Sequence, residues 1–135
     1  MSTDMPRMRE ETGAAAVEFA LVVVLLFMLL LGIMQFGLTM SQWLQVVHSA
    51  REGARWAALQ APESEVRTRV ANAATPITPK RIDISPGDYA TPAGIGKPVT
   101  VTVYYDPAVI SPLFGGLMGI AGIPELKSSA TLRVD

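Results

Sequence analysis

A long uncharged run near the N-terminus restricts what this chain can fold into more than any other feature. Residues 19–34 carry no charged or hydrogen-bonding side chain, and residues 14–40 are interrupted only by Glu18, Gln35 and Thr39. A helix of about 20 apolar residues crosses the ~30 Å hydrocarbon core of a bilayer. A single helix also satisfies its own backbone hydrogen bonds, as the bilayer requires. The sequence therefore predicts one membrane-spanning helix.

A cleaved secretory signal is the main alternative to a retained anchor. Such a signal has an apolar core of about 7–15 residues, followed by a cleavage site built from small residues. The apolar run here is longer, and the residues that follow it, 35–40, read QFGLTM and contain no such site. We therefore expect the span to be retained.

The orientation of the span does not follow from the basic residues. Arg7 and Arg9 precede the span and Arg51 and Arg55 follow it, so the positive-inside rule gives no preference. Long domains cross the membrane largely regardless of their charge. We expect a cytoplasmic leader at residues 1–13, a transmembrane and stalk helix at residues 14–61, and an extracytoplasmic domain at residues 62–135.

The leader meets the span at residues 11–19, which read ETGAAAVEF and end with Phe19. A peptidase needs an accessible backbone at the bond it cuts, and Gly13 offers flexibility without side-chain bulk. Cleavage after Gly13 would give Ala14 a new α-amino group, with Glu18 one helical turn away. A carboxylate at the membrane margin is costly unless it is paired, and this amine, of the same chain or a neighbour, is its natural partner. Alternatively, Glu18 only marks the edge of the bilayer.

The spacing from Gly13 to Glu18 and Phe19 resembles the processing site of the Flp/Tad branch of type IV prepilins. Residues 32–37 (GIMQFG) and 50–55 (AREGAR) resemble the TadE-like proteins of the tight-adherence (Tad) pilus system, and residues 129–133 (SATLR) resemble their closing strand. The resemblance implies a minor pseudopilin of the bacterial inner membrane. It implies cleavage by a prepilin peptidase after Gly13, and assembly or anchoring of a pilus together with other Tad subunits and pseudopilins in a hetero-oligomer.

The helix is expected to continue beyond the membrane, since no proline occurs between residues 8 and 61. One face of its outer part carries a stripe of apolar residues, namely Trp43, Val46, Val47, Ala50, Ala54, Ala57 and Ala58. Polar residues, namely Gln42, Gln45, His48, Ser49, Arg51, Glu52 and Arg55, are assigned to the other side. The stripe packs either on the chain's own domain or on a partner helix. Trp56, Arg51 and Arg55 are our candidate partner contacts.

The outer part of the chain alternates between helix, turn and strand patterns. Ser64 is expected to cap a helix at residues 65–74, with Val66, Val70 and Ala73 facing inward. Strands are expected at residues 81–85, 99–105 and 128–134, and the last should turn Ala130, Leu132 and Val134 inward. We therefore predict an α+β fold in which a small antiparallel sheet packs against the long N-terminal helix, in a pilin-like arrangement.

Residues 109–123 are apolar, but they are interrupted by one proline and four glycines. This segment is too short and too broken for a second span. We expect either a loop packed under the sheet or a loop that dips into the membrane surface or a partner.

Composition argues against several functional classes. The net charge of −1 gives no basic field for nucleic acid, and the lack of cysteine excludes a dithiol redox centre. His48 is the only histidine, and the sequence has no nucleophile elbow, zinc-protease motif or phosphate loop. We expect no enzymatic activity, no catalytic residue, no cofactor, no metal and no small-molecule substrate. The alternative function is an uncleaved single-pass accessory protein of an envelope complex.

Overall fold

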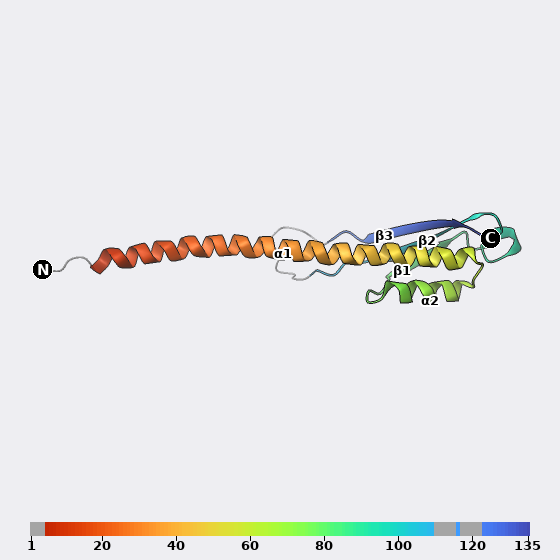
Figure 1. The fold of residues 1–135 in the computed structure, drawn as a ribbon, viewed down its shortest axis with the longest axis horizontal. Coiled ribbons are helices and arrows are strands. Elements are labelled where there is room, and N and C mark those ends of the chain that lie inside the picture. Colours follow the sequence, from red (N-terminus) through yellow and green to blue (C-terminus); the bar gives the residue numbers. More distant parts are fainter. Residues whose placement is uncertain (1–4, 110–115, 117–122) are drawn as a thin grey trace. The chain divides into compact units, whose positions relative to one another are not determined.

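The computed structural model describes residues 5–109, 116 and 123–135, with side chains from residue 13 onwards. Its elements are α1 (Met5–Ala58), α2 (Glu63–Ala74), β1 (Arg81–Ser85), the short 3-10 helix η1 (Pro92–Gly94), β2 (Pro98–Tyr105) and β3 (Leu126–Arg133) (Figure 1). The chain divides into two compact units, Met1–Phe36 and Gly37–Asp135. The predicted α+β class is confirmed. The loop predicted at residues 109–123 lies almost entirely outside the described residues.

The first unit is the N-terminal part of α1, and its large apolar side chains are exposed. Phe19 is 70% exposed, Leu25 69% and Phe36 73%. The most apolar window of α1 has a mean hydropathy of 2.9, and none of that window is buried. A helix that is apolar on all sides is suited to hydrocarbon rather than to water. By length and composition, α1 can therefore cross a membrane, as predicted.

The second unit is a two-layer α/β arrangement. Its sheet is antiparallel with strand order β1-β2-β3, and α1 and α2 cover one of its faces. On that face β2 buries Val99, Val101 and Val103, while the intervening residues stay partly exposed. This alternation is the period of two expected for a strand with one covered face. It confirms the valine pattern from which β2 was predicted.

Small residues of α1 let the helix lie close to the sheet. Ala54 and Ala57 are fully buried in the core cluster that also includes the valines of β2. At Gly53, a Cβ atom would lie 3.0 Å from Cγ1 of Val101 and would collide with Cγ2 of Val70. Gly53 therefore marks the point where α1, α2 and β2 meet without room for a side chain.

The buried face of α1 is rotated from the predicted stripe. Trp43 is 40% exposed and Val47 is only partly buried, whereas Gln42 and Ser49, assigned to the polar side, are buried. The hydroxyl of Ser49 donates a hydrogen bond to the carbonyl of Val46 at 3.0 Å, so its burial leaves no unpaired donor. Close approach to the sheet favours the small Ser49, but it does not account for Gln42, whose buried Oε1 accepts no hydrogen bond among the described residues. The predicted stripe was wrong at these four positions.

A turn with a residue of positive φ ends α1. Gln60 has φ 58°, its N–H donates to the carbonyl of Ala57, and the N–H of Ala61 donates to the carbonyl of Trp56. This is the hydrogen-bond pattern of a Schellman cap. The amide of Gln60 also donates to the carbonyl of Asp135 at 2.8 Å, and this bond holds a non-glycine residue in a position that favours glycine.

The shorter elements agree with their predicted positions apart from individual residues. Ser64 lies inside α2 rather than at its cap, which is Pro62. Ala74, not Ala73, is buried beside Val66 and Val70. Val134, which follows β3, is buried as predicted, but Leu132 is 44% exposed, so the prediction was wrong for Leu132.

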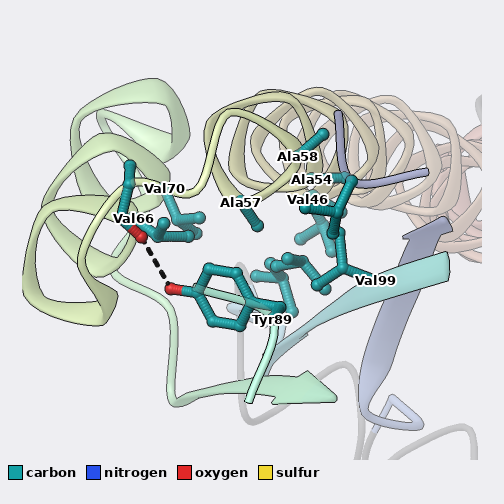
Figure 2. Close-up of a cluster of buried hydrophobic side chains, with 13 residues drawn as sticks. Val46, Ala54, Ala57, Ala58, Val66, Val70, Tyr89 and Val99 are labelled. Atoms are coloured by element: carbon teal, nitrogen blue, oxygen red, sulfur yellow. Dashed lines mark hydrogen bonds between the residues drawn. The ribbon is translucent and has the colours of Figure 1, made fainter. Parts of the chain in front are cut away.

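Tyr89 closes the core between α2 and the sheet (Figure 2). It is 1% exposed, and its hydroxyl donates a hydrogen bond to the carbonyl of Ala61 at 3.0 Å. The loop before β2 is thereby tied to the segment that connects the two helices.

The first prediction concerns the close approach at Gly53. Gly53→Val should lower the free energy of unfolding of the second unit by about 1–3 kcal/mol, the usual cost of overpacking. Thermal or denaturant unfolding of the detergent-solubilised chain measures this change. Gly37→Val is the matched control, because a Cβ at Gly37 meets no atom within 4 Å. Equal stabilities of the two variants would contradict the packing described here.

The second prediction concerns Tyr89. Tyr89→Phe should cost about 1–2 kcal/mol, because it leaves the buried carbonyl of Ala61 without a donor. Burial raises the pKa of Tyr89 above its usual value near 10, so the folded chain retains a proton that the unfolded chain releases. Its contribution to stability is therefore complete below about pH 10 and decreases above it.

Unfolding measured between neutral and strongly alkaline pH should show this decrease in the native chain and a smaller one in Tyr89→Phe. Tyr105→Phe is the control, because the hydroxyl of Tyr105 has no hydrogen bond within the described part of the chain. A Tyr89→Phe variant with native stability and a native alkaline slope would contradict the prediction.

Candidate functional site

The predicted processing junction lies on α1, and its residues are exposed. α1 begins at Met5, so the backbone is already helical at Gly13. No atom lies within 4 Å of a Cβ placed at Gly13, and Phe19 is 70% exposed. Ala14 and Glu18 lie one turn apart on the same side of the helix, as their spacing predicted. Among the described side chains, Glu18 forms no ion pair.

Trp56 is held by contacts within its own chain. Its indole N–H donates a hydrogen bond to Oε1 of Glu52 at 2.8 Å, one turn earlier on α1. The guanidinium of Arg69, on α2, lies 4.1 Å from the centre of the indole ring, within the range of a cation–π interaction. Trp56 is half-buried against the core cluster. It therefore joins α1 to α2, and its predicted contact with a partner stays a prediction.

Arg51 and Arg55 line a groove of about 550 Å³ between α1 and β3. His48 and Glu52 complete its helix side, and residues 129–132 form its other side. Both arginine side chains are exposed, and neither forms an ion pair within the described residues. The carboxylate of Glu52 is engaged by Trp56. The groove therefore presents more positive than negative charge.

Some residues of the AREGAR motif are buried in the core and others are exposed at the groove. Ala50, Gly53 and Ala54 are buried against the sheet, while Arg51 and Arg55 face the groove. The prediction identified both arginines but not the groove, because its second wall comes from β3, distant in the sequence. The Glu52–Trp56 hydrogen bond has a local signal, the i,i+4 spacing, which the sequence interpretation did not use.

No group of three or more His, Asp or Glu side chains within residues 5–109, 116 and 123–135 is arranged to hold a metal ion. His48, expected to be an exposed polar residue, is exposed at the groove. That the chain has no catalytic, cofactor or metal site stays a prediction.

The third prediction separates the two roles of Trp56. Trp56→Ala should lower the free energy of unfolding by about 1–2 kcal/mol, because it removes a half-buried ring, its hydrogen bond and its contact with Arg69. Trp43→Ala is the control, because Trp43 is the other tryptophan, lies on the same helix and is 40% exposed. It should lower stability less than Trp56→Ala does, because only Trp56 has a hydrogen bond to Glu52 and a cation–π contact with Arg69. If Trp56→Ala keeps native stability and only cross-linking to other subunits is lost, the partner role is the correct one.

Comparison with known proteins finds a family match for about a third of the chain, which includes the span and the AREGAR motif. Residues 13–55 match the family described as TadE-like protein. Neither a curated protein nor a solved structure matches the chain. The match begins at the predicted cleavage residue, covers the whole apolar span and ends at the last arginine of the AREGAR motif. Residues 13–55 of this chain are therefore similar to the TadE-like family, as their motifs predicted, and this similarity points to involvement in a Tad pilus system.

Proposed function

We propose that this chain is a minor pseudopilin that is cut after Gly13 by a prepilin peptidase and helps to assemble or anchor a Tad pilus. The observation that carries the proposal is the match of residues 13–55 to the TadE-like family, a segment that contains Gly13, Glu18 and the whole apolar span. The span supports a membrane location, and the bacterial inner membrane is part of the proposal. Residues 1–13 would face the cytoplasm, and the unit Gly37–Asp135 would lie outside it.

Cleavage at Gly13 requires local unwinding of α1, which is helical there. A glycine within a helix costs about 0.5–1 kcal/mol relative to alanine, so unwinding is easiest at this residue. The exposed surroundings of Gly13 leave room for an enzyme to approach. Thr12 and Ala14, the neighbours of Gly13, are also small and add little steric hindrance.

Glu18 acts after the cut. The new α-amino group of Ala14 is positive, and Glu18 lies one turn, or about 6 Å, further along the helix. The carboxylate of Glu18 forms no ion pair in the uncut chain, within the part that the structure describes. At the apolar margin of a membrane, pairing with the amine of its own chain or of a neighbour relieves the cost of the charge. Such pairing would fix the register of neighbouring helices during assembly.

An uncleaved single-pass accessory protein of an envelope complex is the second candidate. One observation favours the accessory protein. α1 continues from Met5 through Gly13 without a break, whereas a peptidase needs an extended backbone at the bond that it cuts. The two functions share the span and the outer unit, and they differ only in the fate of the bond after Gly13.

The fourth prediction distinguishes these functions. In cells with the cognate peptidase, the membrane-extracted chain should begin at Ala14, whereas Gly13→Val should remain full length because the side chain obstructs the scissile bond. Intact mass and N-terminal sequencing measure both. Gly37→Val, a glycine change in the same helix, should be cut normally. A native chain that retains its N-terminal residues would overturn cleavage and leave the accessory protein.

Glu18→Gln extends the same experiment to assembly. This variant should be cut as the native chain is, but it should enter pilus complexes poorly, because the neutral amide cannot neutralise the amine. Co-purification with other pilus subunits measures the loss. Normal assembly of Glu18→Gln would contradict the role of the carboxylate and leave the cleavage result unaffected.

A further inference from the structure

A β-bulge sets which backbone groups of β3 face outward. Gly96 has φ +77°, its N–H donates to the carbonyl of Val134 at 2.9 Å, and the N–H of Val134 donates to the carbonyl of Lys97 at 2.9 Å. Two residues before β2 thus oppose one residue after β3, and the first is a glycine with positive φ. This is a G1 bulge, and Val134 is in its hydrogen-bonded position.

Hydrogen-bonded and non-hydrogen-bonded positions alternate along an antiparallel pair. Counting back from Val134, Leu132 and Ala130 point their backbone groups toward β2. Ser129 and Thr131 therefore point their N–H and C=O groups away from the sheet. Pro98 is consistent with this alternation. It pairs with Arg133 at a position that is not hydrogen-bonded, where β2 donates no N–H to β3, and proline has no backbone N–H to donate.

The outer edge of β3 is accessible along the groove. The strand order leaves both β1 and β3 at an edge. Arg67 of α2 covers part of the β1 edge by donating a hydrogen bond to the carbonyl of Ile82 at 2.8 Å. At β3, by contrast, four consecutive residues, 129–132, line the groove. The side chains of these four residues alternate between the two faces of the sheet. The groove therefore lies along the outer edge of β3 rather than over one face of the sheet.

Positive charge accompanies this edge on both sides. Arg51 and Arg55 lie across the groove on α1, while β3 carries Lys127 and Arg133 and has no acidic residue. Figure 1 shows β3 running alongside α1 within the second unit. The two arginines are four residues apart, a rise of about 6 Å. Two residues of a strand span about 6.6 Å, so alternate side chains of an added strand match that spacing.

We infer that the edge of β3 and the arginine face of α1 together bind an extended acidic segment of a partner protein by strand addition. The segment pairs its backbone with Ser129 and Thr131 and places alternate carboxylates against Arg51 and Arg55. A groove between a helix and an edge strand supplies backbone hydrogen bonds for affinity and side-chain contacts for specificity. The inference does not depend on cleavage at Gly13.

The alternative is that the charges only protect the edge. Lysine on an edge strand discourages unwanted pairing between sheets, and Lys127 fits that role. Protection of the edge does not account for Arg51 and Arg55 of α1, which face the edge of β3 across the groove and whose spacing matches alternate side chains of a strand. It also predicts that β3 binds no added strand.

The test uses the full chain in detergent micelles and a capped peptide as long as β3 in which glutamate alternates with threonine. Fluorescence anisotropy of the labelled peptide should show saturable binding, and the Ser129 and Thr131 amides should exchange hydrogen more slowly in the complex. A peptide with lysine in place of glutamate tests charge. Two peptides N-methylated on alternate residues, one at the odd and one at the even positions, test backbone pairing. The peptide whose methyl groups replace the N–H groups that face β3 should fail to bind, and the other should bind.

Matched variants separate the groove from general charge. Arg51→Ala with Arg55→Ala should raise the Kd for the acidic peptide about tenfold, the effect expected from losing two charge-assisted contacts. Lys80→Ala with Lys97→Ala removes the same charge away from the groove and should leave the Kd within about twofold. Both double variants should remain folded, because the ion pairs of Lys80 with Asp106 and Glu125 that the control removes are exposed and contribute little to stability.

Several outcomes would overturn the inference. These are a lack of saturable binding, equal binding of the lysine peptide, equal binding of both methylated peptides, or equal effects of the two double variants. Protection of the β3 amides that increases with protein concentration, without peptide, would instead identify a second copy of this chain as the occupant and would also overturn it.

Discussion

The contact of α1 with β2 and α2 at Gly53 is the constraint on which the second unit depends. A three-stranded sheet and one short helix bury little apolar surface by themselves, so α1 has to supply the remaining cover. It does so with residues so small that the valines of β2 reach the helix backbone. The close approach increases dispersion contacts for each residue buried, which compensates for the small size of the unit.

One helix serves two environments because its pattern of side chains changes along its length. In the first unit apolar side chains surround the helix on all sides, a pattern suited to hydrocarbon. In the second unit only one face is buried, and it is formed mainly by alanine, glycine and serine, together with Gln42 and Val46. The change allows the family segment to combine a span with a packing surface, without an intervening break in α1.

Local patterns predicted the elements, and contacts between distant segments decided the details. The alternation of Val99, Val101 and Val103 was sufficient to predict β2 and its buried face. The burial of Ser49 was not predictable from polarity, since it depends on a bond to its own helix and on the distance to the sheet. The arginines of the site were predicted from the motif. Their groove was not, because β3 supplies its other wall.

Packing and binding are coupled through the AREGAR motif. Successive residues of a helix are rotated by about 100°, so burying Gly53 determines the direction in which Arg51 and Arg55 point. Rotation of the helix by a single residue would bring either Glu52 or the methyl group of Ala54 to the position of Gly53 beside Val101, and it would change the direction in which the arginine pair points. The glycine thus does more than allow close contact with the sheet, because it also orients the cationic face toward the outer edge of β3. The motif therefore combines small residues, which pack against the sheet, with charged residues, which face the groove.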